Sequence, residues 1–283
     1  MLYIVGTPIG NEADFSPRAK EILSSVDLIA CEDTRTTALF LSHFSIRNQL
    51  ISYHEHNRAK RNKEILEMLN EGKNIALVSD AGMPCVSDPG AELVHACHQA
   101  NISLTVIPGP VAAISGLVVS GLDTRRFFFE GFLPVSGKER KERISELKKL
   151  KYTFVLYEAP HRILRTLDDL NQAGFTERKM TICRELTKKY EEIIYTTVSD
   201  AAGFFADREP KGEFVLVVEG YRESEQQNMF EELDDKQREA EILSMKKIGM
   251  STKEIAKNLS EKWQVPQKQI YQLVIQIIEK NLV

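Results

Sequence analysis

The chain has 283 residues, of which 42% are hydrophobic and 28% are charged, which is the composition of an ordinary globular protein long enough for two domains. Its formal net charge of −4 excludes a whole-molecule attraction to nucleic acid or to anionic membranes. Because residues 222–241 hold eight acids and only three bases, the rest of the chain is close to neutral and leaves local basic surfaces open.

Over the first 110 residues, short apolar runs alternate with segments of helical period. This rhythm, with strands that are apolar throughout, predicts a mostly parallel sheet covered by helices on both faces. Strands are predicted over 2–5, 28–31, 49–53, 74–79 and 104–107, and helices over 17–25, 36–43, 58–71 and 89–100.

A second set of elements follows a helix of small residues predicted over 112–120. Its strands are predicted over 127–132, 153–157, 179–183, 193–198 and 214–219, and its helices over 138–150, 161–173 and 199–206. The sequence therefore predicts an α/β fold with two α/β domains, over 1–115 and 116–221. The composition then becomes acidic and polar, which predicts a linker over 222–238.

Residues 239–283 are predicted to form a small helical extension. Apolar residues recur at helical spacing at 255, 259 and 263, and again at 270, 274 and 278 after the break "QVPQ". Ser251 and Glu254 predict a helix start. Two helices around a short turn, preceded by a third at 239–247, fit either a helix-turn-helix-like bundle or a cap that packs on the body.

The N-terminus and the cysteines bear on the compartment. The chain opens on a predicted strand with no basic segment before it, and no apolar stretch reaches the length of a membrane span. The four cysteines show no CxxC pairing. We therefore expect no signal peptide, no membrane association and a reducing compartment, most simply the cytoplasm.

Three turns rich in glycine and proline follow predicted strands: "VGTPIGN" (5–11), "SDAGMP" (79–84) and "IPGPVAA" (107–113). Open α/β sheets bind ligands at such strand ends, and glycine lets the backbone approach a ligand closely. None of the turns is a GxGxxG or Walker loop, and none contains Lys or Arg. This pattern favours a flat, weakly charged or zwitterionic ligand over a polyphosphate, with Asp80 accepting from its donors. The alternative is three ordinary turns.

The second acidic turn, "SDPG" (87–90), is interpreted differently. Asp88 directly precedes Pro89, and an acidic residue before a proline is typical of a helix start. We therefore predict that Asp88 caps the helix that follows.

Nine motifs occur in order across residues 3–220: "YIVGTPIGN", "CEDTRTT", "YHEHN", "LVSDAGMPCVSDPG", "IPGPVAAISGLVVSGL", "EGFLP", "YEAPHRI", "RELTK" and "KGEFVLVVEG". Together they resemble the ribosomal RNA methyltransferases of the tetrapyrrole methylase-like (class III) S-adenosylmethionine-dependent family. The helical tail is similar to an extension found in that family. The resemblance implies two α/β domains with S-adenosylmethionine in the cleft between them, a homodimer, and 2′-O-methylation of a cytidine in the decoding region of 16S ribosomal RNA of the small subunit.

The resemblance also carries cofactor positions onto this chain. Relatives that methylate tetrapyrroles or diphthamide often have a hydroxyl residue where Val111 stands, so that one side-chain contact differs while backbone contacts are kept. The implied cofactor residues are Gly6, Pro8, Ile9, Asp80, Gly82, Met83, Val111, Ala112, Tyr157, Glu213 and Phe214.

Methyl transfer to a ribose hydroxyl needs positioning, and a base or a cation near the developing alkoxide helps further. Polar motifs at predicted strand ends supply candidates, with the alternative that they form interdomain ion pairs around a cleft. The candidate catalytic residues are Glu32, Asp33, Arg35, Glu158, Arg184, Glu185 and Lys188. Lys188 is the candidate for stabilising the hydroxyl's anion.

Contacts to RNA are expected from basic and polar side chains near the cleft. His54 and His56 share one strand face, but no third metal ligand is evident, so we expect RNA contact there and no metal. The usual interpretation of the basic segment 137–151 is a solvated face with ion pairs along the helix. The residues expected to contact RNA are His54, Arg125, Arg126, Lys138, Arg140, Lys141 and Arg162.

Two other functions fit the same fold. One keeps the cofactor and changes the acceptor to a tetrapyrrole or a protein side chain. The other is a non-catalytic RNA-binding or ribosome-assembly factor. Fold alone does not decide the acceptor. The local features that favour an RNA methyltransferase are the basic runs, the "EDTR" and "PHR" motifs and the tail.

Overall fold

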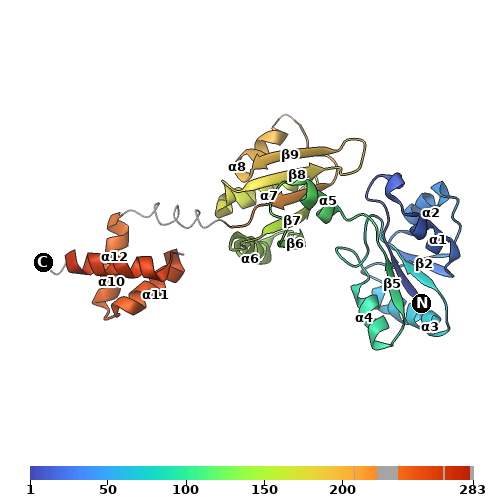
Figure 1. Cartoon of the computed structure of the whole chain (residues 1–283), viewed down its shortest axis with the longest axis horizontal. Coiled ribbons are helices and arrows are strands. Elements are labelled where there is room, and N and C mark those ends of the chain that lie inside the picture. The colour runs from blue at the N-terminus through green and yellow to red at the C-terminus, as the bar shows by residue number, and fades with distance from the viewer. Residues whose placement is uncertain (207, 222–234, 264, 281–283) are drawn as a thin grey trace. The chain divides into compact units, whose positions relative to one another are not determined.

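The computed structural model describes residues 1–206, 208–221, 235–263 and 265–280 (Figure 1). The chain divides into two compact units, Met1–Glu219 and Gly220–Val283. None of the helices in the described part of the chain is both long and apolar enough to cross a membrane. The predicted boundaries at 115, 221 and 238 stay predictions, and residues 222–234 of the predicted linker lie outside the described residues.

The first half of the larger unit is a parallel five-stranded sheet of order β3-β2-β4-β1-β5, as predicted. Alternate side chains of each strand point to opposite faces, so Leu2 and Ile4 pack under α3 and α4 while Val5 packs under α1 and α2. The elements are β1 (Leu2–Val5), α1 (Pro17–Ser25), β2 (Leu28–Cys31), α2 (Thr34–His43), β3 (Leu50–Ser52), α3 (Arg58–Asn70), β4 (Ile75–Leu77), α4 (Ala91–Gln99) and β5 (Leu104–Ile107), with the short 3₁₀ helix η1 (Glu12–Asp14) after β1.

The second half is a mixed sheet of order β6-β7-β10-β8-β9, in which only β6 and β7 pair in parallel. Its elements are α5 (Ala112–Val119), β6 (Phe127–Phe132), α6 (Gly137–Lys148), β7 (Thr153–Glu158), α7 (Ile163–Leu170), η2 (Asn171–Phe175), β8 (Lys179–Arg184), β9 (Glu192–Thr197), α8 (Val198–Ala201), η3 (Ala202–Phe205) and β10 (Phe214–Val218).

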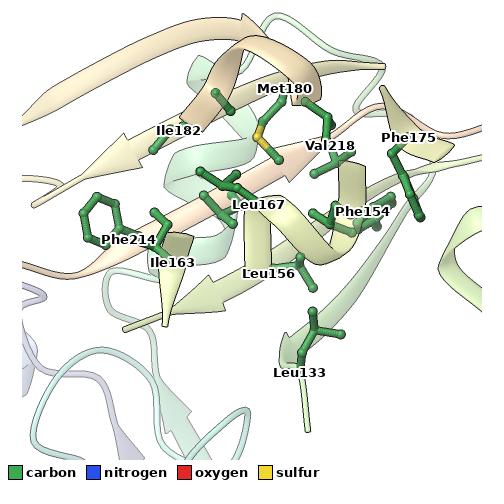
Figure 2. Packing of buried hydrophobic residues seen from close by; sticks show 14 of the residues in the cluster. Leu133, Phe154, Leu156, Ile163, Leu167, Phe175, Met180, Ile182, Phe214 and Val218 are labelled. Atoms are coloured by element: carbon green, nitrogen blue, oxygen red, sulfur yellow. The ribbon is translucent and has the colours of Figure 1, made fainter. Parts of the chain in front are cut away.

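Figure 2 shows the core on one face of this second sheet, where Phe154, Leu156 and Phe214 pack against Ile163 and Leu167 of α7. The opposite face packs against α5 through a separate cluster that includes Val155, Cys183 and Val215. Ile9, from the turn after β1, belongs to this second cluster. The first turn of the parallel sheet is thereby attached to the second sheet.

The smaller unit contains α10 (Asp235–Lys247), α11 (Thr252–Trp263) and α12 (Gln267–Lys280). The predicted apolar positions Ile255, Leu259, Ile270 and Val274 form its core, together with Ile242 of α10. At the predicted helix start, the Ser251 hydroxyl accepts from Glu254 N at 3.3 Å and the Glu254 carboxylate accepts from Ser251 N at 2.9 Å. The predicted helices of the tail are confirmed, although α10 begins earlier than the predicted Glu239.

Candidate functional site

The three glycine- and proline-rich turns meet at the carboxyl end of the parallel sheet. Backbone hydrogen bonds join the first two, because Thr7 N donates to Gly82 O at 2.9 Å and Gly82 N donates to Thr7 O at 3.2 Å. The Thr7 hydroxyl also donates to Ser79 O at 3.2 Å. The predicted convergence of these turns at the strand ends is therefore observed, and the turns form one interlocked loop cluster.

Two glycines allow the first and third turns to touch. A Cβ on Gly6 would lie 2.6 Å from Met83 Sδ and 2.7 Å from Gly109 Cα, and a Cβ on Gly109 would lie 2.8 Å from Gly6 Cα. Real side chains do not occupy such distances. Only glycine fits at both positions, so the first and third turns pack backbone against backbone beside an open space.

That space is a cavity of about 290 Å³ enclosed by both sheets of the larger unit. The parallel sheet contributes the turns after β1, β4 and β5, and the mixed sheet contributes the ends of β6, β7, β8 and β10. The cavity is lined by Ile9, Ala81, Gly82, Met83, Val86, Ser87, Asp88, Val111, Ala112, Phe132, Tyr157, Glu158, Ala159, Pro160, Cys183, Leu186, Glu213, Phe214 and Val215.

Most of the predicted cofactor residues line this cavity. Gly6, Pro8 and Asp80 do not line it. Gly6 packs against Gly109 within the loop cluster, and the Asp80 side chain accepts from Asp33 N at 3.3 Å. The Tyr157 hydroxyl accepts from Ala113 N at 3.0 Å and thereby fixes the first turn of α5 against β7. The cofactor roles of these residues stay predictions.

The charge of the cavity is negative. Asp88, Glu158 and Glu213 lie among the described residues that line it, and no Lys, Arg or His does. The remaining walls are aliphatic and aromatic, with Phe132 and Tyr157 in edge contact at 5.6 Å between ring centroids. Such walls suit an apolar or aromatic ligand that carries a positive charge.

The prediction that Asp88 caps the following helix is wrong. The N-cap of α4 is Gly90, with φ at 140° and no side-chain cap, so Asp88 caps no helix. Gly90 tolerates this backbone, and a Cβ there would lie 2.5 Å from Cys85 Sγ. The turn therefore bends before the helix begins and leaves Asp88 on the cavity wall.

The Asp88 carboxylate has no hydrogen-bond or ion-pair partner among the described residues. Burial, reinforced by the neighbouring Glu32 and Asp80 carboxylates, raises its pKa from 3.8 to about 6. The pKa of Glu32 is also raised, by burial and by Asp80, and that of Asp80 is raised by burial. These carboxylates follow β2 and β4, whose carboxyl ends lie at one sheet edge.

Glu158, by contrast, is held at both oxygens. Its Oε1 accepts from Ala159 N at 3.0 Å and lies 3.2 Å from Arg162 Nε, while Oε2 accepts from the Thr166 hydroxyl at 2.5 Å. Arg162 in turn donates to Leu133 O at 2.5 Å. Because donors already occupy both oxygens, Glu158 is poorly placed to accept a proton from a substrate.

Arg140 completes this network, and its position corrects a second prediction from the sequence. Its side chain is 3% exposed, and it donates to Asp169 Oδ2 at 2.6 Å, Thr166 Oγ1 at 2.8 Å and Pro134 O at 3.0 Å. All three guanidinium nitrogens thus have internal acceptors. The predicted contact of Arg140 with RNA does not fit this burial, and Arg140 is a structural residue.

The "CEDTRTT" motif is also largely structural. Asp33 is the N-cap of α2 and accepts from Arg35 N at 2.8 Å and Thr36 N at 3.4 Å. The Arg35 guanidinium lies 2.9 Å from the same carboxylate. These hydrogen bonds, the side-chain bond from Arg35 first among them, lower the pKa of Asp33 to about 2. Asp33 is therefore a weak base, which leaves Glu32 as the candidate of this motif.

The "RELTK" motif forms a charge cluster at one side of the cavity. Lys188 Nζ lies 2.9 Å from Glu185 Oε1 and 3.1 Å from Glu213 Oε2. Burial opposes the charge of Lys188, but its bonds to Glu185 and Glu213 raise its pKa overall. Arg184 points elsewhere, to Glu192 at 2.8 Å and Lys211 O at 2.6 Å.

The candidates for RNA contact are dispersed over the larger unit. His54 accepts at Nε2 from the Asn57 side chain, and its Nδ1 is buried without a partner in the described structure. Arg125 pairs with Asp123 at 2.9 Å, Arg126 contacts Tyr152 at 3.3 Å, and Lys138 lies 3.5 Å from Glu142. Lys141 is exposed, and Arg162 is held by Glu158.

Comparison with known proteins finds the same architecture in a known family. A family model described as "Tetrapyrrole (Corrin/Porphyrin) Methylases" matches residues 1–202. A uroporphyrin-III-C-methyltransferase from Thermus thermophilus superposes with a TM-score of 0.55 at 19% identity, covering 77% of this chain and 93% of that chain. A cobalt precorrin-4 methyltransferase gives 0.58 at 16% identity, covering 76% and 93%. The fold is thus that of the tetrapyrrole methylases.

Curated relatives make the assignment finer. Ribosomal RNA small subunit methyltransferase I of a Synechocystis species is 46% identical over 98% of both chains. Its namesake in Bacillus subtilis is 42% identical over 96% of this chain and 92% of its own. This chain therefore belongs to the tetrapyrrole methylase family and, within it, to the ribosomal RNA small subunit methyltransferase I group. The resemblance inferred from the nine motifs is confirmed.

One of the curated relatives is shorter than this chain. Ribosomal RNA small subunit methyltransferase I of Thermotoga maritima is 45% identical over 219 residues, which are 98% of its own length but 77% of this chain. Nearly a quarter of this chain therefore has no counterpart in that relative.

Proposed function

We propose that this chain transfers a methyl group from S-adenosylmethionine to the ribose 2′-hydroxyl of a cytidine in 16S ribosomal RNA of the small subunit, in the cytoplasm. The observation that carries the proposal is the cavity between the two sheets, built from the interlocked glycine turns of the parallel sheet and the strand ends of the mixed sheet. The relatives named above support the ribosomal RNA acceptor. The position and base identity of the target nucleotide come from the family resemblance.

The residues of the cavity fit S-adenosylmethionine. When bound, this cofactor supplies a methyl group activated by a positively charged sulfur. The lining carboxylates and the absence of cations among the described lining residues suit that charge. The residues proposed to hold it are Ile9, Gly82, Met83, Val111, Ala112, Tyr157, Glu213 and Phe214.

Asp88 is proposed as the group that accepts the proton of the 2′-hydroxyl. A base works best when its pKa lies near the operating pH, and about 6 satisfies this better than the value of about 2 for Asp33. Glu158 has no free oxygen for the task because donors hold both. Lys188, held by Glu185 and Glu213, remains proposed as the cation beside the alkoxide.

The pH dependence follows from this role. Asp88 must be ionised to accept a proton, so kcat/KM should rise as the pH passes through about 6 and then level off. Replacement by asparagine should lower kcat by about 10²–10⁴-fold, the usual contribution of a positioned base. A D88N enzyme that keeps kcat and the same pH profile would remove Asp88 from the chemistry.

A homodimer is also proposed, through the outer face of α5. Ile114 and Val118, one helical turn apart, are 43% and 71% exposed, and the neighbouring Tyr195 is 67% exposed. A V118K variant should move the light-scattering mass from that of a dimer to that of a monomer. A wild-type chain that is monomeric at micromolar concentration would refute this part of the proposal.

The proposed reaction is tested with labelled S-adenosylmethionine. The purified chain is offered small ribosomal subunits and naked 16S ribosomal RNA from cells that lack the enzyme, and digested nucleosides are identified by mass spectrometry. Label on one cytidine ribose is expected. Bound cofactor without transfer to either RNA would refute the acceptor and direct the search to tetrapyrrole or protein acceptors.

A further inference from the structure

A second concave surface lies between α6 and the segment α7–η2. It encloses about 430 Å³ and is lined by residues of both elements, among them Lys141, Ser145 and Lys148 of α6 and Arg165 and Asp169 of α7. We call it the α6–α7 groove. None of these five residues lines the cavity, and of the five only Lys141 was predicted to contact RNA.

Basic and acidic side chains lie on different faces of α6. Lys141, Ser145 and Lys148 follow at four- and three-residue steps, which places them on one side of the helix, and all three line the groove. The acids of this helix do not line it. Glu142 and Glu146 instead pair with Lys138 at 3.5 Å and Arg143 at 3.1 Å. The charged residues of α6 that line the groove are therefore all basic.

Asp169, the only acid among the described residues that line the groove, is already neutralised by an ion pair. Asp169 accepts the charge-assisted bond from buried Arg140 at 2.6 Å, and its distance to Arg165 is 3.9 Å. Lys141 and Lys148 have no ion pair in the described structure. Lys141, Lys148 and Arg165 therefore line the groove beside the Arg140–Asp169 pair, which carries no net charge.

The groove and the cavity are joined by hydrogen bonds through the interior. Asp169 and Arg140 line the groove, Glu158 lines the cavity, and Thr166 lies between them, accepting from Arg140 at 2.8 Å and donating to Glu158 at 2.5 Å. Both surfaces are consequently held by one buried network.

We propose that the α6–α7 groove binds phosphates of the RNA backbone that flanks the target nucleotide. Lys141 and Lys148, seven residues apart, are separated by about 10 Å along the helix, which suits an extended polyanion better than a single small anion. Contacts of this kind position a nucleic acid without reading its sequence. The inference rests on the proposed function, because it supplies the binding surface for the RNA that is to be methylated.

The test compares two matched double variants of the full chain. K141A/K148A removes two charges that line the groove, and K149A/K151A removes two exposed charges directly after it on the same segment. Binding of unmethylated 16S ribosomal RNA is measured by filter retention at several salt concentrations. Cofactor affinity, by calorimetry, and thermal melting verify that the rest of the molecule is intact.

The K141A/K148A variant should bind RNA at least about tenfold more weakly than the wild type, and its log–log salt slope should be shallower by about 1.5, or 0.7–0.9 for each lost phosphate contact. Its cofactor affinity should be unchanged. K149A/K151A should bind as the wild type does. R165A alone, on the opposite wall, should give a smaller loss in the same direction.

Equal RNA affinity and salt slope in K141A/K148A and K149A/K151A would overturn the groove as an RNA surface. Loss of binding to small subunits with unchanged binding to naked RNA would also overturn it and would assign the groove to a ribosomal protein. Because binding is measured without turnover, a wild-type chain that binds RNA through the groove but methylates none would refute the proposed reaction and leave the groove supported.

Discussion

Replacing Asp88 by asparagine should make the protein more stable at neutral pH. In the folded protein, burial and the nearby carboxylates raise the pKa of Asp88 from 3.8 to about 6. Above pH 6 the folded state therefore holds an anion that the unfolded chain accommodates more easily. Each pKa unit corresponds to 1.36 kcal/mol, so the shift corresponds to at most about 3 kcal/mol.

The carboxylate is only partly buried, and solvent screening reduces this figure to about 1–2 kcal/mol. The sign follows from proton uptake: between pH 6 and pH 4 the folded state binds the proton first, so the wild type recovers the difference as the pH falls. Below pH 4 both states are protonated and the two proteins should be equally stable.

Thermal unfolding of wild type and D88N at pH 4 and pH 8 measures this directly. At pH 8 the variant should melt about 2–8 °C higher, given about 2–4 °C for each kcal/mol in a domain of this size. At pH 4 the difference should vanish. Equal melting temperatures at both pH values, or a variant that is less stable at pH 8, would refute the placement of an unpaired carboxylate on the cavity wall.

Three further outcomes follow from the same structure. G6A should weaken S-adenosylmethionine binding at least about tenfold in calorimetry, because packed cores do not absorb a 2.6 Å approach to Met83, whereas G203A, whose Cβ would meet nothing within 4 Å, should bind normally. Y157F removes the acceptor of Ala113 N and should cost about 1–2 kcal/mol in urea unfolding; no change would mean that this N–H finds another partner. A chain ending at residue 221 should keep its cofactor affinity, since every described residue that lines the cavity belongs to the first unit, and a lost affinity would refute this expectation.

The sheets could be predicted well from the sequence, and the reason is local. β1, β2, β5 and β6 match the predicted ranges residue for residue, and the apolar runs of β2 and β5 are bounded on both sides by polar or turn-forming residues. The helix predicted over 161–173 was less accurate. It begins at Ile163 and passes into a π turn at Asn171–Phe175, where Gly174 has a φ of 86°. Tertiary packing of Phe175 against Phe154 decides that ending, and periodicity does not record it.

The candidate site was predictable where it consists of backbone. Glycine and proline at strand ends identified the three turns as a possible ligand site, and the family resemblance assigned Gly82, Met83 and Ala112 to the cofactor; all three line the cavity. Four other lining residues, Phe132, Cys183, Leu186 and Val215, were not assigned to the site. Phe132, Leu186 and Val215 lie in the recognised motifs "EGFLP", "RELTK" and "KGEFVLVVEG", and Cys183 directly precedes "RELTK". An apolar side chain gives the same signal in the sequence whether it faces a core or a cavity.

The predicted roles of Asp88 and Arg140 were both wrong, and for the same reason. Asp88 stands before a proline and a helix, which is the sequence context of a cap, and Arg140 stands in a basic helix, which is the context of a surface. The left-handed backbone at Cys85, with φ at 72°, and the unusual φ of Gly90 turn the "SDPG" segment so that Asp88 faces the cavity. Arg140 faces inward because Asp169, 29 residues later in the chain, is its partner. Charge in sequence identifies a titratable group, but only its partners decide whether that group supports the fold or remains free for chemistry.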